Sequence, residues 1–337
     1  MSASSTSSAP HVMQCMEVWG GNRSADHGVV MPGLDAWVYS EPYAPESTGN
    51  EERLADSGGG DVHFVSSCGT GRIARMVLAD VSGHGVTVAG AAQSLRTMMR
   101  RYMNFIDQTA FVEALNRAFG APDIASGRFA TSVAMTFFAP TARLDLCNAG
   151  HPRPLRYRAK TREWSFLIAP DSRASDRNDE ISNLPLGVLE PTRYEEFGVA
   201  LATHDLVLAY TDAVTEARSP SGELLGEARL LEIVRSLDAT TPAELLSALR
   251  AKLDDWRGGA APDDDLTLLL LHHNGVGTQA PILRRLWASV RFLGTVARNL
   301  VPVGSPPPIP WPEFRRENIL GALAPKAART WSVKEDA

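Results

Sequence analysis

The sequence is poor in cysteine, and it lacks both a long apolar run and a surplus of positive charge. Its three cysteines, Cys15, Cys68 and Cys147, are odd in number and have no CxxC spacing, which indicates neither a disulfide scaffold nor a zinc site. Such sparse use of cysteine fits a reducing cytoplasm. The net charge of −6 at pH 7 argues against a nucleic-acid-binding surface. We therefore expect no nucleic acid among the partners.

The absence of an apolar stretch of about 18 residues predicts no transmembrane helix. The first ten residues are rich in serine and alanine without an apolar core, so no signal peptide is expected, and the prediction is a cytoplasmic protein. Residues 1–12 are of low complexity and are predicted to be disordered. The remaining length suffices for one large domain or two ordinary ones.

One glycine-rich stretch, residues 58–85, predicts a β-hairpin with an acidic end. Two runs of alternating apolar residues are joined by Gly69-Thr70-Gly71, which is typical of a hairpin turn. Asp61 opens the first run and Asp80 closes the second, so pairing of the runs brings the two carboxylates together. Adjacent carboxylates repel, and a divalent cation relieves the repulsion. The alternative is a surface hairpin with two solvated aspartates.

Apolar periodicity outlines the remaining elements. Spacings of three and four residues predict helices, and short alternating or continuous apolar runs predict strands. The expected helices are 86–105, 111–119, 227–236 and 242–256. The expected strands are 13–20, 34–40, 130–139, 143–148, 155–158, 164–168, 193–199, 205–210 and 266–271, with a polar exposed loop at 171–183. Runs of strands with interposed helix pairs indicate an α+β sandwich rather than βαβ units.

Aspartates recur where predicted strands meet loops. Asp61 and Asp80 are joined by Asp212 and by one member of the run 263–265. Convergence of these strand ends would create a site of oxygen ligands, which suits magnesium or manganese better than zinc. Two such ions can bind a phosphoryl oxygen and activate a water for hydrolysis. Because aspartate also favours turns for local reasons, four unrelated turn residues are the alternative.

Seven ordered motifs resemble one enzyme family: GGDVHF, LADVSGHG, ATSVAMTFF, NAGHPRPL, LPLGV, AYTDAVTEAR and DDDLTLLLL. Together they span residues 59–272 and are similar to the SpoIIE-like bacterial branch of the metal-dependent serine/threonine protein phosphatases (PPM, or protein phosphatase 2C-like). The resemblance implies an αββα fold, an antiparallel β-sandwich flanked by helices. It also implies a site for two Mn²⁺ or Mg²⁺ ions between the sheets.

The same resemblance assigns roles to individual residues. Asp61, Asp80, Asp212 and Asp264 correspond to the acidic metal ligands, and the backbone carbonyl of Val81 corresponds to a further one. Thr267 sets the register that selects Asp264. Ala213 stands where the family has glycine, and a need for positive φ there would strain alanine and displace Asp212.

Three further polar residues lie within these motifs. His84 is either a proton donor near the metals or a cap of the following helix. His151 is expected to shape a turn, with Asn148 bonding to the backbone. Glu216 is expected to support the loop after Asp212.

The composition changes after residue 273, and we divide the chain there into a phosphatase domain, 13–273, and a tail, 274–337. Residues 281–301 predict a basic amphipathic helix, followed by the proline-rich SPPPIPWP. Such a helix binds a membrane surface or a regulatory partner, or it packs on its own domain or on a second copy in a homodimer.

Taken together, the sequence predicts a metal-dependent phosphoprotein phosphatase whose metals activate a water. The resemblance implies a phosphorylated protein substrate, such as an anti-sigma-factor antagonist in bacterial partner switching. Two alternatives stay open: a pseudophosphatase that only binds phosphoproteins, and a two-metal hydrolase of small phosphate esters.

Overall fold

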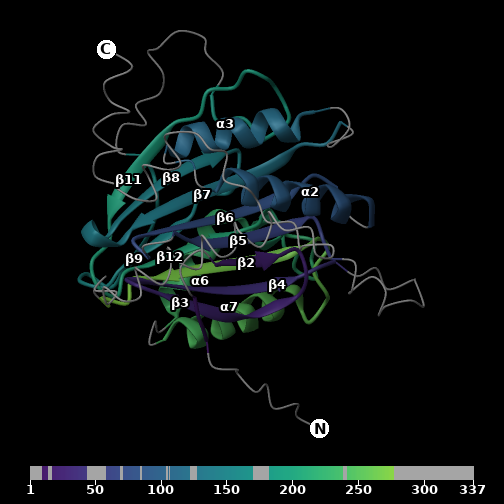
Figure 1. Cartoon of the computed structure of the whole chain (residues 1–337). Helices are drawn as coiled ribbons and strands as arrows, with labels where there is room; N and C mark the ends of the chain where they lie inside the picture. Colours follow the sequence, from purple (N-terminus) through teal and green to yellow (C-terminus); the bar gives the residue numbers. More distant parts are fainter. Residues whose placement is uncertain are drawn as a thin grey trace, which may run out of the picture.

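Two β-sheets pack face to face, and a pair of helices covers the outer face of each sheet (Figure 1). The computed structural model describes residues 10–13, 17–43, 58–68, 71–83, 86–103, 105, 107–121, 127–169, 182–237 and 241–276. The predicted α+β sandwich of αββα type is thereby confirmed.

The first sheet, sheet A, has seven strands in the order β1-β3-β4-β13-β12-β9-β10. Its neighbours pair antiparallel except β1 and β3, which are parallel. In that order the strands are His11–Val12, Ala25–Met31, Leu34–Glu41, Leu266–His272, Leu206–Tyr210, Leu155–Arg158 and Glu163–Phe166.

The second sheet, sheet B, has six strands, all antiparallel, in the order β11-β8-β7-β6-β5-β2. They are Glu196–Ala200, Arg143–Ala149, Ala130–Phe138, Ile73–Val81, Asp61–Ser67 and Val18–Gly21. Side chains alternate along β6: Met76 and Leu78 join the core between the sheets, whereas Val77 and Ala79 join the core under the helices. Both faces of sheet B are therefore buried.

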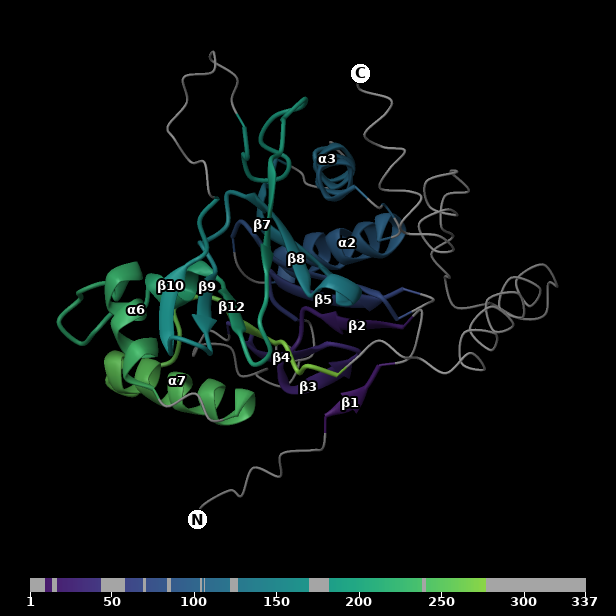
Figure 2. The same ribbon diagram turned by 90° about the vertical axis from the view of Figure 1, so that its left-hand side faces the viewer.

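Helices α2 (Val86–Tyr102) and α3 (Gln108–Phe119) cover sheet B, and α6 (Gly226–Ser236) and α7 (Pro242–Arg257) cover sheet A (Figure 2). Two short elements complete the fold, the 3₁₀ turn η1 (Ala139–Thr141) and the single turn α5 (Asp212–Thr215). The ends of α7 carry ordinary helix signals. The Thr241 side chain accepts from Glu244 N at its start, and Gly258 has φ +65° at its end.

Two strands, β1 and β3, were not predicted. The prediction of disorder for residues 1–12 is wrong at His11–Val12, because these residues form β1 and pair with β3. In the β3 sequence, ADHGVVM, two polar residues and a glycine follow Ala25, so apolar alternation is weak there. Packing explains Gly28, because a Cβ atom at that position would lie 2.6 Å from the Trp37 ring. Tertiary contact with β4 therefore overrides a poor local strand signal.

Several predictions fall outside the described residues. They are His84, the polar loop as far as residue 181, the first nine residues and the predicted tail helix 281–301. Within the part that is described, no helix is long and apolar enough to cross a membrane.

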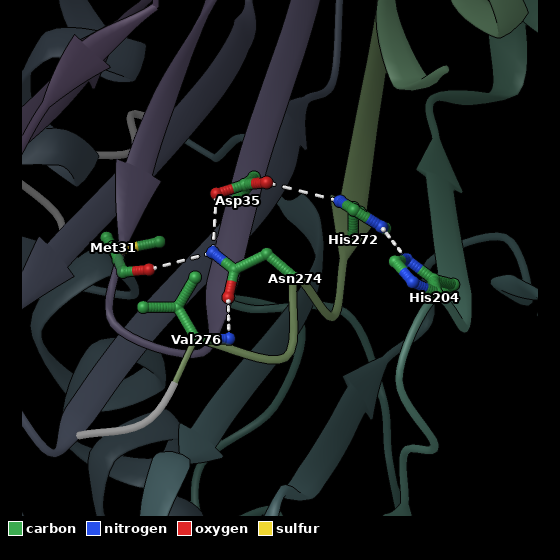
Figure 3. A network of polar contacts seen from close by, with 6 residues as sticks. All are labelled: Met31, Asp35, His204, His272, Asn274 and Val276. Atoms are coloured by element: carbon green, nitrogen blue, oxygen red, sulfur yellow. Dashed lines mark hydrogen bonds and ion pairs between the residues drawn. The ribbon is translucent and has the colours of Figure 1, made fainter. Parts of the chain in front are cut away.

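The last described segment is tied to sheet A by a polar network (Figure 3). Asn274 Nδ2 donates to Met31 O at 3.0 Å and to Asp35 Oδ1 at 2.7 Å, and Asn274 Oδ1 accepts from Val276 N at 2.9 Å. The network continues from Asp35 Oδ2 to His272 Nδ1 at 3.1 Å. Asn274 therefore fixes where the chain leaves the sandwich.

Replacing Asn274 by alanine is expected to lower the free energy of unfolding by about 1–2 kcal/mol, because three hydrogen bonds are lost. His204 provides the control, since its exposed ring contacts His272 at the outer end of the same network. His204→Asn, which tolerates the positive φ of this position, should change stability by less than about 0.5 kcal/mol. Urea unfolding measures both, and equal effects would contradict the assignment.

Candidate metal centre

Asp61 and Asp80 face each other at one end of the β5–β6 hairpin. The strand register pairs Asp61 directly with Asp80, which confirms the proximity predicted from the sequence. Val65, four positions after Asp61, and Leu78, two positions before Asp80, belong to the core between the sheets, so these two carboxylates also lie on the face between the sheets. The side chain of Asp61 is almost fully buried, with 2% of its surface exposed.

The two oxygens of the Asp61 carboxylate have different surroundings. Oδ2 accepts a hydrogen bond of 2.9 Å from Thr211 Oγ1. Oδ1 is buried and has no hydrogen-bond partner among the described residues. Burial raises the pKa of Asp61 well above its usual range, and the charges of Asp80 and Asp265 raise it further. A buried carboxylate oxygen without a donor is a strong acceptor for a cation.

Asp80 lies among carboxylates that come from both sheets. Burial is the main reason that its pKa rises to about 8, and neighbouring negative charges add to the rise. Those charges belong to Asp212, Asp264, Asp265 and Glu216. The pKa of Asp212 is raised as well, first by burial and then by Glu216 and Asp264. Acidic residues separated by up to about 200 positions in the chain therefore lie close enough to interact electrostatically at one edge of the sandwich.

In the acidic run 263–265, Asp265 holds two backbone segments in place. Its Oδ1 accepts from Tyr43 N and its Oδ2 from Gly60 N, both at 2.6 Å, and it is 4% exposed. Asp264 is half-buried, and its Oδ1 accepts from Asp265 N at 2.8 Å. Because Asp265 uses both oxygens to hold backbone, its neighbour Asp264 remains the better candidate for a metal ligand.

The two glycines before Asp61 make room for this arrangement. A Cβ atom on Gly59 would lie 2.2 Å from Asp265 Oδ1, and one on Gly60 would lie 2.9 Å from the backbone oxygen of Val81. Gly60 therefore leaves open the side of the Val81 carbonyl, which the sequence analysis named as a ligand. Only glycine permits this close approach of backbone and carboxylate.

Ala213 is compatible with its position. It lies in α5, does not have positive φ, and is 8% exposed. The strain that a left-handed conformation would impose on alanine does not arise, and Asp212 is not displaced for that reason.

Ala213→Gly should therefore leave the phosphatase activity predicted from the sequence within about twofold of wild type and lower the free energy of unfolding by about 0.5–1 kcal/mol. Steady-state kinetics and urea unfolding on the same preparation measure the two effects. A large gain in activity would show that alanine impairs the site.

His151 and Asn148 form the turn that was predicted for them. His151 N donates to Asn148 Oδ1 at 2.7 Å, and Asn148 Nδ2 donates back to His151 O at 2.8 Å. The His151 ring is buried, which lowers its pKa to about 3, and its Nδ1 is 2.8 Å from Thr131 Oγ1. Thr131 is the cross-strand neighbour of Asp80. The neutral His151 ring therefore lies close to the edge of the sandwich that carries Asp61, Asp80, Asp212 and Asp264, here called the acidic edge.

The donor set fits a hard divalent cation. Among the described residues no three His, Cys, Asp or Glu side chains lie close enough together to hold a metal ion on their own. The fit rests instead on the unpartnered oxygen of Asp61, the raised pKa of Asp80 and the unobstructed Val81 carbonyl. Donors that are all oxygen suit Mg²⁺ or Mn²⁺.

Sequence reasoning missed two residues that shape this edge, Thr211 and Asp265. Thr211 precedes a predicted ligand, and Asp265 follows one, so both were read as parts of motifs rather than as separate groups. The available signal was the adjacency itself, because a buried polar residue at either end of a buried strand usually has a hydrogen-bond partner.

Comparison with known proteins agrees with the fold and the motifs. The family model described as Stage II sporulation protein E (SpoIIE) matches residues 70–274. Protein IcfG of Synechocystis sp. is 31% identical over 70 residues, which are 21% of this chain and 11% of IcfG. The chain thus spans about a tenth of that curated relative.

Two solved structures share the architecture. The RsbU and RsbW domains of Rv1364c from Mycobacterium tuberculosis match with a TM-score of 0.56 and 23% identity, over 72% of this chain and 62% of theirs. The SiaA-PP2C domain of Pseudomonas aeruginosa matches with a TM-score of 0.54 and 16% identity, over 70% of this chain and 85% of its own. At these identities the likeness concerns the fold alone. With the family model covering more than half of its length, the chain belongs to the SpoIIE family of PPM-type serine/threonine phosphatases.

Proposed function

We propose that this chain is a Mn²⁺- or Mg²⁺-dependent phosphatase of phosphoserine or phosphothreonine in proteins. The observation that carries the proposal is the meeting of carboxylates from both sheets around Asp61, whose Oδ1 is buried and has no hydrogen-bond donor within the described part of the chain. Burial, and after it mutual repulsion, raises the pKa of these acids, and bound divalent cations would stabilise their charged forms.

Asp61 and Asp80 from sheet B, with Asp212 and Asp264 beside sheet A, would hold two ions together with the Val81 carbonyl. When bound, the ions supply Lewis-acid chemistry, which polarises a phosphoryl oxygen and lowers the pKa of water toward neutrality. Asp265 anchors the backbone of Gly60 and so places the start of β5. The chain's own contribution is to fix these oxygens before the substrate arrives.

The substrate class follows from the family. One of the similar solved structures contains RsbU and RsbW domains, named together in one protein. We propose that this chain acts in bacterial partner switching, on a serine- or threonine-phosphorylated anti-sigma-factor antagonist. A cytoplasmic location, with a membrane-surface, regulatory-partner or homodimer contact through residues 281–301, belongs to the same proposal.

A metal and substrate panel tests the proposed function. Hydrolysis of p-nitrophenyl phosphate and of phosphoserine and phosphothreonine peptides is measured with Mn²⁺, with Mg²⁺ and with EDTA. We expect turnover of the peptides with either ion and none with EDTA. Phosphopeptide binding without turnover under any metal would indicate a pseudophosphatase. Faster hydrolysis of nucleotides than of phosphopeptides would indicate a hydrolase of small phosphate esters.

A further inference from the structure

Thr211 links the two sheets at the acidic edge. It follows β12 in sheet A, is fully buried, and donates its backbone N–H to Thr267 O at 3.1 Å. Its side chain reaches across the core to Asp61, the first residue of β5 in sheet B. The contact therefore joins residues 150 positions apart.

The direction of the Thr211 hydroxyl bond is fixed by its neighbours. Thr211 Oγ1 accepts from Thr267 N at 2.9 Å, so its single proton is available for an acceptor. Asp61 Oδ2 is the nearest acceptor, at 2.9 Å, whereas the backbone oxygens of Asp265 and Thr267 lie at 3.4 and 3.5 Å. The hydroxyl thus donates to Asp61.

Thr267 supports this arrangement from β13. It is also fully buried, its backbone N–H donates to Thr211 Oγ1 at 2.9 Å, and its own Oγ1 lies 3.0 Å from Ser40 Oγ. A charge-assisted hydrogen bond on one carboxylate oxygen prevents free rotation of the group. With Oδ2 held, Oδ1 is the oxygen that remains without a donor among the described residues.

We propose that Thr211, assisted by Thr267, is a positioning residue of the metal centre. Its hydroxyl fixes which oxygen of Asp61 is presented to the ions and ties the ligands of sheet B to those of sheet A. This inference rests on the proposed function, because it assumes that Asp61 is a ligand. Outer partners of metal ligands commonly act in this way by orienting the ligand.

The test compares Mn²⁺ binding by the full chain and four variants, using isothermal titration calorimetry. Thr211→Val keeps the shape of the side chain but removes the donor. We expect it to weaken Mn²⁺ binding about 10- to 100-fold. Thr211→Ser keeps the hydroxyl and should bind within about threefold of wild type, whereas Thr211→Ala, which loses the same methyl group and also the hydroxyl, should match the valine variant. The Ser–Ala comparison isolates the hydroxyl even if the valine variant folds poorly.

Thr192 provides the matched control. It is 5% exposed, and its hydroxyl donates to Leu189 O at 2.6 Å, outside the acidic cluster. Thr192→Val should cost folding stability but leave Mn²⁺ affinity unchanged. A similar loss of affinity in Thr192→Val and Thr211→Val would mean general destabilisation and would overturn the inference.

The outcomes separate the two proposals. Undiminished Mn²⁺ binding by Thr211→Val and Thr211→Ala, with normal binding by wild type, overturns the positioning role alone. Failure of the wild-type chain to bind Mn²⁺ overturns the proposed function and the inference with it. A loss confined to the variants without a hydroxyl supports both.

Discussion

Asp80→Asn is expected to abolish phosphatase activity and, at the same time, to stabilise the metal-free protein. Removal of a ligand should lower kcat/KM by at least about a hundredfold, since losing only an outer partner of a ligand already costs 10- to 100-fold. Without metal, the folded state disfavours the ionised form of Asp80, whose pKa rises to about 8 chiefly through burial, whereas the unfolded chain ionises this group freely near neutral pH. Neutral asparagine avoids that penalty, so the free energy of unfolding in EDTA should rise by at least about 2 kcal/mol near neutral pH.

The matched control is Asp263→Asn, the same chemical change at an exposed residue next to Asp264. It should alter activity by less than about threefold and stability by less than about 0.5 kcal/mol. Activity is measured with Mn²⁺ and a phosphopeptide, and stability by urea unfolding in EDTA. An Asp80→Asn protein that is active, or less stable than wild type without metal, would contradict the account of the acidic edge.

The metal-free protein should lose stability as the pH rises through neutrality. The folded state raises the pKa of Asp80 from its ordinary value of 3.8 to about 8, so between these values the folded chain binds more protons than the unfolded chain. Stability then falls with rising pH, by up to about 1.4 kcal/mol per pH unit for each extra proton. Below the ordinary value both states are protonated, and the penalty disappears.

Urea unfolding at several pH values, in EDTA and in Mn²⁺, measures this effect. The difference in stability between Asp80→Asn and wild type isolates the contribution of Asp80, and in EDTA it should widen from about pH 6 to about pH 8. Saturating Mn²⁺ should stabilise wild type most at the higher pH, because metal binding requires deprotonated carboxylates. A difference that stays constant with pH, or narrows, would show that Asp80 does not hold a proton in the folded state.

The local part of the site could be predicted from the sequence. A hairpin places its two ends together whatever surrounds it, so Asp61 and Asp80 could be paired from alternation and the intervening turn. The seven motifs then indicated the family, and the resemblance to that family predicted the β-sandwich flanked by helices. The same reasoning did not predict β3, because two polar residues and Gly28 interrupt its apolar alternation. The strand forms through its packing against Trp37.

The inter-sheet part of the site could not be predicted from local patterns. Nothing in the spacing of Thr211 and Asp61 shows that their side chains are 2.9 Å apart, since that distance depends on how two sheets pack. Whether Asp264 or Asp265 is the metal ligand likewise depends on tertiary contacts, because Tyr43 and Gly60 donate their backbone N–H groups to Asp265. The doubt about Ala213 concerned its backbone conformation, and the structure gives it no positive φ.

Carboxylates from both sheets are proposed to hold two divalent cations at one edge of the sandwich. Crystals grown with Mn²⁺, with diffraction recorded at the manganese absorption edge, would locate these ions. We expect two anomalous peaks about 3.5–4 Å apart. Both should lie between the carboxylates of Asp61 and Asp80 on one side and those of Asp212 and Asp264 on the other. Peaks bound elsewhere, or none at this edge in an otherwise intact structure, would contradict this proposal.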